Sequence, residues 1–121
     1  MGVNAPKLVV LTDAEGCIEW VNESFIRTCG YSFDEVRGQK PGKLLQGPAT
    51  DRETVQDLRS AIAAATHTEC SLINYRKDGS PYTVHIMLSP LAEDGKLVGF
   101  LVWRKTLASP RGWLRQSGRP R

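Results

Sequence analysis

Two polar residues interrupt apolar alternations in the sequence and are the best candidates for binding chemistry. Asn74 lies in a predicted strand at residues 68–77, and Arg104 lies in another at residues 96–105. A buried polar group without a hydrogen-bond partner costs roughly 1–3 kcal/mol, so each residue needs a partner. Asn74 therefore contacts a ligand or bonds a nearby loop. Arg104 either pairs with a carboxylate or phosphate of a ligand or extends its charged end to solvent.

The residue types that most often perform catalysis or bind metals are not arranged for it. Cys17, Cys29 and Cys70 are odd in number and form no C-x-x-C, so neither a disulfide framework nor a zinc site is expected. Residues 38–43 superficially resemble a phosphate loop, but three residues separate the glycines where that loop has four, and Leu44 replaces Ser or Thr. The sequence also lacks G-x-S-x-G and H-E-x-x-H. We therefore expect no catalytic residues, no metal site and no enzyme.

Length and composition describe one globular domain. The chain has 121 residues, of which 40% are hydrophobic and 24% are charged. No apolar run reaches the ~18–20 residues of a membrane span. The N-terminus lacks the basic and then apolar layout of a secretory signal, so we expect a cytoplasmic protein. We also expect an N-terminal extension at residues 1–6, a single domain at 7–108 and a flexible basic tail at 109–121.

The net charge of +3 is a property of that tail. Four of the 16 Lys+Arg lie in residues 109–121, which contain no acid. Residues 1–108 therefore hold 12 Lys+Arg against 13 Asp+Glu. A nucleic-acid-binding domain would carry a basic face on its folded body. We expect neither a nucleic-acid partner nor a membrane partner.

Hydrophobic periodicity and turn signals predict the secondary structure. β-Branched runs bounded by turn residues predict strands at residues 7–12, 17–21, 68–77, 81–91 and 96–105. Capping residues predict helices at 23–29, at a single turn after Ser32, and at about 51–65, where Thr50 opens a capping box. Residues 39–49 contain two prolines and two glycines and are expected to form mainly loop. Segregated strands and helices predict an α+β domain with an antiparallel sheet.

Both faces of that sheet are substantially apolar. Alternation places Val98 with Asn74 and Arg104 on one face, and Leu97 on the other. Helices can cover only one face of such a sheet, so the second face should contact a partner, and we expect a homodimer. The candidate interface residues are Ile73, Tyr75, Met87, Leu101 and Trp103.

Several stretches of this sequence resemble a PAS domain, in particular the branch close to light-oxygen-voltage (LOV) flavin photosensors. The resemblance covers residues 8–106 and rests on TDAEGCIEWVNESF at 12–25, GYSFDEVRG at 30–38, LLQGPATDRETVQDLRSAI at 44–62, INYRKDGSPY at 73–82 and LSPLAEDGKLVGF at 88–100. It implies a five-stranded antiparallel sheet of order 2-1-5-4-3 with short helices on one face. It also implies a cofactor, when present, between helices and sheet, and an outer face that serves dimerisation and signal transfer.

The resemblance also implies where a flavin would be held. The candidate cofactor-binding residues are Gln46, Arg59, Asn74, Lys43, Arg104 and Trp20. The first three match flavin contacts of the photosensors, and Lys43 stands where they have a phosphate-binding Arg. Arg104 replaces a Gln of the last strand, and Val84 replaces an Asn at the pyrimidine edge of the flavin. Trp20 is a candidate to stack on a planar cofactor, although packing in the core or at an interface is commoner.

The photosensors carry a cysteine that bonds to the flavin under blue light, and this chain has Gly42 at that position. We therefore expect no photoadduct. The resemblance also bears on haem, because haem-binding PAS domains use a histidine of a helix as the proximal ligand. His67 falls just past the predicted helix and His85 lies on the outer face, so haem is disfavoured.

Two functions remain open. The first is a sensory module that binds FAD or FMN, senses redox state and signals through the outer face to an effector domain or partner not yet known. The second is a ligand-free module for homodimerisation.

Overall fold

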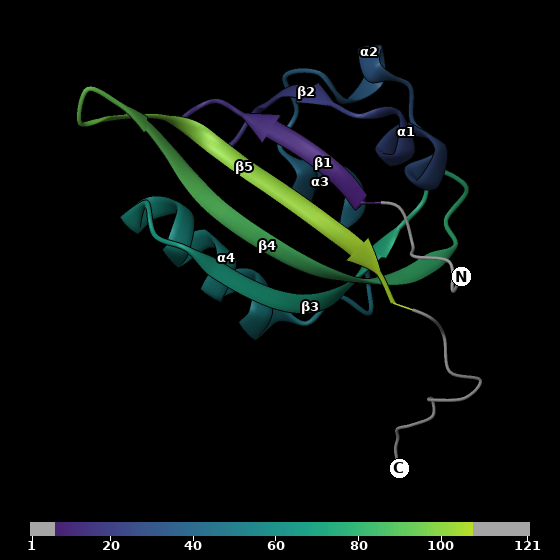
Figure 1. Ribbon diagram of the computed structural model, residues 1–121. Coiled ribbons are helices and arrows are strands. Elements are labelled where there is room, and N and C mark those ends of the chain that lie inside the picture. The colour runs from purple at the N-terminus through teal and green to yellow at the C-terminus, as the bar shows by residue number, and fades with distance from the viewer. Residues whose placement is uncertain (1–6, 108–121) are drawn as a thin grey trace, which may run out of the picture.

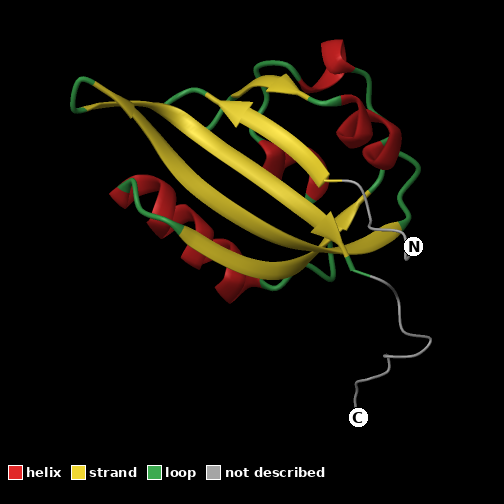
Figure 2. Ribbon diagram, viewed as in Figure 1, coloured by secondary structure: helices red, strands yellow, loops and turns green. Residues whose placement is uncertain are grey.

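Strands and helices, which Figure 2 distinguishes by colour, occupy separate parts of the chain. The computed structural model describes residues 7–107. Its strands are β1 (Lys7–Thr12), β2 (Ile18–Val21), β3 (Thr68–Tyr75), β4 (Pro81–Glu93) and β5 (Lys96–Thr106). Its helices are α1 (Glu23–Cys29), α2 (Phe33–Val36), α3 (Pro41–Leu45) and α4 (Arg52–Ala64). The predicted N-terminal extension and basic tail lie outside the described residues.

The five strands form one antiparallel sheet of order β2-β1-β5-β4-β3 (Figure 1). This order confirms both the α+β class and the arrangement that the PAS resemblance implied. It places β1 and β5, the two ends of the domain, side by side in the middle of the sheet. Among residues 7–107, none of the helices has the length and apolar character needed to cross a membrane.

The helices pack against one face of the sheet, which we call the inner face. Each helix contributes a buried side chain to a single core cluster, namely Phe25, Val36, Leu45 and Val55. The sheet contributes alternate residues of its strands, such as Val10, Val84 and Val102. Within residues 7–107, no helix lies over the opposite, outer face (Figure 1). The core therefore lies between one sheet and one layer of short helices.

Side-chain caps begin the helices as the sequence predicted, with one correction. Asn22 accepts a hydrogen bond from the Phe25 amide at 3.1 Å, and Ser32 forms a complete capping box with Glu35. The cap of α4, however, is Asp51 and not Thr50, since the Asp51 carboxylate accepts the Thr54 amide at 2.9 Å. The buried Thr50 hydroxyl is already used elsewhere, because it donates to the Ile73 carbonyl at 2.6 Å.

The prediction that residues 39–49 are mainly loop was wrong for Pro41–Leu45, which form α3. Proline is usually a helix breaker, but in the first turn of a helix its missing amide hydrogen is not needed. Pro41 occupies that position here. The segment is important for function because α3 forms one wall of the cavity described below.

The face predicted for two residues near the start of β5 was also wrong. Leu97 packs against the core cluster, whereas Val98 is 43% exposed. The β4–β5 register shifts at Leu91 and Ala92, and such an irregularity reverses which residues point inward. Just beyond, a Cβ atom at Gly99 would lie 2.0 Å from the carbonyl oxygen of Thr12. Only glycine therefore allows β1 and β5 to approach each other here.

Candidate functional site

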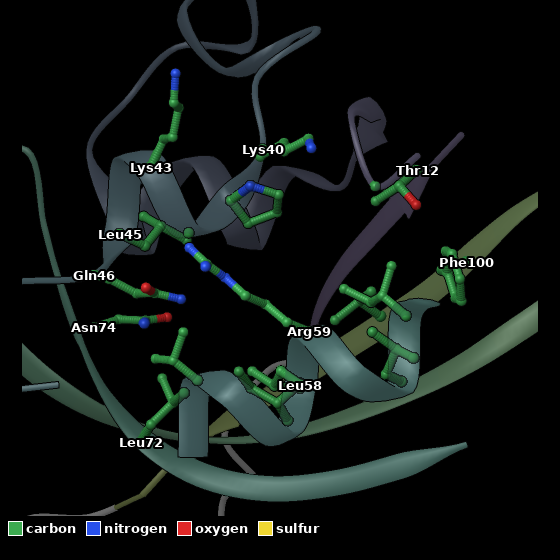
Figure 3. A pocket seen from close by; sticks show the side chains of 18 of the residues that line it. Thr12, Lys40, Lys43, Leu45, Gln46, Leu58, Arg59, Leu72, Asn74 and Phe100 are labelled. Atoms are coloured by element: carbon green, nitrogen blue, oxygen red, sulfur yellow. The ribbon is translucent and has the colours of Figure 1, made fainter. Parts of the chain in front are cut away.

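A cavity of about 630 Å³ lies between the inner face of the sheet and helices α3 and α4 (Figure 3). Leu58 and Ile62 of α4 face it together, because residues four apart lie on one side of a helix. The sheet supplies the opposite wall with Leu72, Ile86, Leu88, Phe100 and Val102. Small-molecule pockets typically measure roughly 300–1,000 Å³. The cavity is therefore an apolar space of a size suited to an organic ligand.

Positive side chains line part of the wall, and we call Lys40, Lys43 and Arg59 the rim of the cavity. All three are exposed, and Arg59 extends from α4 toward Leu45 and Gln46 of the opposite helical segment (Figure 3). Glu15 is the single carboxylate among the lining residues of the described chain. A rim of this charge favours an anionic group such as a phosphate.

Arg104 and Asn74 lie at the sheet side of the cavity, and we call this pair the inner end. The Arg104 Nη1 donates to the Asn74 Oδ1 at 3.1 Å, and the two residues are 5% and 2% exposed. The Arg104 Nε has no hydrogen-bond partner within the described chain. Burial lowers the pKa of the guanidinium, yet an arginine side chain stays protonated in proteins. Of the two alternatives for Arg104, extension to solvent is therefore wrong.

Tyr82 is a polar neighbour of the inner end and was not among the predicted site residues. It pairs with Asn74 across β3 and β4, and its buried hydroxyl also lacks a partner among the described residues. Burial raises the pKa of the phenol, so it is neutral at pH 7. The sequence could have indicated this, because alternation along the strand places Tyr82 on the same face as the apolar Val84 and Ile86.

Gly42 lines the cavity beside Gln46. A Cβ atom at Gly42 would lie 2.8 Å from the Gln46 Nε2, which is the end of a flexible side chain. None of the cysteines is among the lining residues of the described chain. Burial raises the pKa of the Cys29 and Cys70 thiols, so both are protonated at pH 7.

The structure brings five of the six predicted cofactor-binding residues around this one cavity: Gln46, Arg59, Asn74, Lys43 and Arg104. Trp20 is not among them. It is 47% exposed and pairs with Leu11, which in turn pairs with Leu101 of the outer face. Since paired residues of neighbouring strands share a face, Trp20 lies on the outer face and cannot stack on a ligand in the cavity.

The outer face is apolar and partly exposed in the described chain. Trp103 pairs with Met87 on one side and with Val9 on the other. The Lys7 ammonium lies 4.1 Å from the centroid of the Trp103 ring, a cation–π contact. Leu101 and Ile73 are also only partly buried.

Tyr75 does not belong with those residues, and its assignment to the interface needs correction. Its hydroxyl accepts the Ala49 amide at 2.8 Å, and its ring lies so close to Gly47 that a Cβ there would be 2.4 Å away. Tyr75 ends the edge strand β3, so its side chain can reach around the edge to the segment between α3 and α4. The tyrosine therefore holds that segment against the sheet.

The chain is similar in sequence to curated proteins whose names refer to LOV domains or blue light. The chain is 37% identical over 86 residues to Protein TWIN LOV 1 of Arabidopsis thaliana, which is 69% of this chain and 21% of that protein. It is 40% identical over 84 residues to Blue-light-activated histidine kinase 1 of Erythrobacter litoralis, which is 69% of this chain and 23% of that protein. The chain therefore spans about a fifth of the length of these curated relatives.

A solved structure is similar over most of the domain. The light-state structure of the Aureochrome1 LOV domain, a blue-light photoreceptor, superimposes with a TM-score of 0.81 and 29% identity, covering 88% of this chain and 86% of that chain. The PAS domain family itself matches residues 6–104. This match includes all the described helices and strands, except for the last two residues of β5. The chain belongs to the PAS domain family.

Proposed function

We propose that this PAS domain binds a flavin, FMN or FAD, in the cavity and reports the redox state of that flavin without photochemistry. A PAS domain is a sensory module rather than a catalytic one, and the proposal adds the ligand and the signal. The observation that carries it is the cavity itself, which combines apolar walls, a positive rim and a buried guanidinium at the inner end.

The residues around the cavity fit a flavin. An isoalloxazine ring has two apolar faces and an edge with carbonyl oxygens, so it needs apolar walls and hydrogen-bond donors. Leu58 and Leu72 belong to the two walls, and the unpartnered Nε of Arg104 is a donor that a buried carbonyl would satisfy. Lys43 and Arg59 at the rim supply charge for a phosphate. When bound, the flavin would supply electron-accepting chemistry, while these residues bind and orient it.

The relatives and the cysteines support the two halves of the proposal separately. Relatives with blue-light activation in their names favour a flavin, the pigment that the LOV resemblance implies. The LOV resemblance matches Gly42 to the position of the photoreactive cysteine, and no cysteine is among the lining residues of the described chain. Both points favour a dark function.

Absorption spectroscopy of the purified chain, alone and after addition of FMN or FAD followed by desalting, tests the ligand. We expect a retained flavin band in the blue and no reversible bleach under blue light. A protein that retains neither flavin after reconstitution would contradict the proposed ligand. A reversible bleach with a new near-ultraviolet band would contradict the dark function.

The Gly42→Cys variant tests the dark function by a gain of photochemistry. Gly42 does not require the left-handed backbone region, and its nearest obstacle is the movable end of Gln46, so a cysteine can be accommodated. We expect this variant, loaded with FMN, to bleach reversibly under blue light. Gly42→Ser is the matched control, since it has the same shape without the thiol, and it should not bleach. If Gly42→Cys behaves like Gly42→Ser, Gly42 is not at the photoreactive position.

The outer face is the proposed route of the signal, through a homodimer or another partner. Trp103→Glu places a charge among the apolar residues Met87 and Val9, and we expect it to convert dimers to monomers in sedimentation velocity. Gln56→Glu adds the same charge on an exposed position of α4 and should leave the mass unchanged. Equal masses for Trp103→Glu and the unmodified chain would show that the dimer surface lies elsewhere.

The same outer face favours a second candidate function. A chain that bound no flavin but dimerised through Trp103 would be a ligand-free interaction module. The spectroscopic and sedimentation experiments together distinguish the two functions, because the first reports only on the cavity and the second only on the outer face.

A further inference from the structure

Arg104 carries a charge in a buried place where the described chain provides no counter-ion. Its hydrogen-bond partner is the neutral amide of Asn74, and no carboxylate of residues 7–107 forms an ion pair with it. The guanidinium also makes a cation–π contact with Phe25, whose ring centroid lies 5.8 Å from the guanidinium carbon. Buried charges in proteins are normally paired, because desolvation of an unpaired charge is costly.

The titratable groups that face Arg104 do not supply the missing charge. They are Tyr82, Cys29 and Cys70. All three are buried or partly buried, and burial raises the pKa of each, so they are neutral at pH 7. Among residues 7–107, the guanidinium is therefore next to neutral titratable groups and lines the cavity.

We infer that Arg104 makes the inner end of the cavity a site for negative charge. With a flavin bound, this site favours the reduced, anionic form of the flavin over its oxidised, neutral form. This inference rests on the proposed flavin ligand. Reduction takes two electrons from a reductant and one proton from solvent, which leaves one negative charge on the ring system. In a buried site that charge attracts the guanidinium strongly, because the local dielectric constant is low.

The rim does not produce the same preference. Lys43 and Arg59 are exposed, and a phosphate near them carries the same charge in both redox states. The rim therefore strengthens binding of both forms about equally, whereas the inner end distinguishes them. This difference allows Arg104 to be tested separately from the affinity for flavin.

The test is the midpoint potential of FMN bound to the full chain, measured by anaerobic titration with dithionite against a reference dye. We expect Arg104→Gln to lower the ratio of reduced to oxidised affinity at least tenfold, which corresponds to about 30 mV for a two-electron couple. Arg104→Lys retains the charge and should keep most of the ratio. Lys105→Gln is the matched control, because it removes one positive charge from the next residue, which is exposed, and should leave the potential unchanged.

If Arg104→Gln changes the ratio less than twofold, or no more than Lys105→Gln does, the inference is wrong while the flavin proposal stands. If no FMN or FAD binds, the flavin proposal and the redox preference both fail, and the first part of the inference, that the inner end is a site for negative charge, is decided on the apo protein. Benzoate and benzamide have the same shape and differ in charge. We expect benzoate to raise the melting temperature of the unmodified chain more than benzamide does, and Arg104→Gln to remove that difference. Equal effects of the two compounds on the unmodified chain would overturn the inference.

Discussion

The inner end and the rim of the cavity both carry positive charge, but they hold it in opposite ways. At the inner end, Arg104 is 5% exposed and donates to an Asn that is itself 2% exposed. At the rim, Lys43 and Arg59 are exposed to water. Water and salt screen the exposed charges within about 8–10 Å, whereas a buried charge is screened much less. The arginine at the inner end therefore affects folding and distinguishes ligands by charge, whereas the arginine at the rim attracts any anionic group weakly.

The contrast also separates stability from binding. A buried guanidinium depends on each of its few partners, so changes at the inner end should affect folding as well as the ligand. An exposed lysine or arginine is replaced at little cost to the fold. Three substitutions test this, in order of decreasing effect.

Asn74→Ala should have the largest effect on stability. It removes the hydrogen-bond acceptor of Arg104 and leaves a buried guanidinium without one, which costs about 2–3 kcal/mol of unfolding free energy. Urea denaturation of the apo protein measures this value. Ser71→Ala, at an exposed position of the same strand, should change it by less than about 0.5 kcal/mol. If the two variants are equally stable, Arg104 does not depend on Asn74 and the contrast between inner end and rim fails.

Arg59→Gln should have a moderate effect, on binding alone. We expect the affinity for FMN to fall roughly threefold to fivefold at low salt, the range of an exposed ion pair, and this loss to shrink as salt is added. Fluorescence titration measures both. Riboflavin lacks the phosphate, so its affinity should be the same for the variant and the unmodified chain. A salt-independent loss, or an equal loss for riboflavin, would show that Arg59 contacts the ring system instead.

Glu35→Gln should have the smallest effect, because the ion pair of Glu35 with Lys77 is exposed. The hydrogen bond from Lys77 is the main cause that lowers the pKa of the Glu35 carboxyl. A carboxyl whose pKa is lower in the folded state stabilises the fold above its ordinary pKa of 4.5, and this contribution is lost as the pH falls through the folded value. The stability difference between Glu35→Gln and the unmodified chain should therefore be present at pH 7 and disappear in acid.

Denaturation midpoints measured from pH 7 down to pH 3 check this prediction. Asp34→Asn is the matched control, since it removes a neighbouring charge that has no such ion pair among the described residues. A difference for Glu35→Gln that grows as the pH falls would contradict the assigned sign.

The sequence predicted the sheet well because alternation and turn residues are local signals. The bounds of β1 and α1 agree with prediction to the residue, and the strand order follows from the PAS resemblance. The errors arose where a distant contact decides the structure. The Thr50 hydroxyl donates to the Ile73 carbonyl and therefore does not cap the helix. The register shift at Leu91 reverses the face on which Leu97 lies.

The candidate site shows the same division. Arg104 and Asn74 were recognised because polar residues on an apolar strand are conspicuous, but their bond to each other depends on pairing between strands far apart in sequence. Trp20 was assigned to the cavity because an aromatic residue can stack on a cofactor. Its face depends on the pairing of β1 with β2, which a short strand does not reveal. Pro41 concealed α3, because proline disrupts the interior of a helix but is favoured in its first turn.

The close approach at Gly99 has a consequence for how sequences of this kind can vary. The Thr12 carbonyl occupies the space where any side chain at residue 99 would begin. Homologues that keep the pairing of the first and last strands should therefore hold glycine at this position. A homologue with a larger residue there must have displaced its first strand, and an alignment of many such sequences would reveal that substitution together with changes around Thr12.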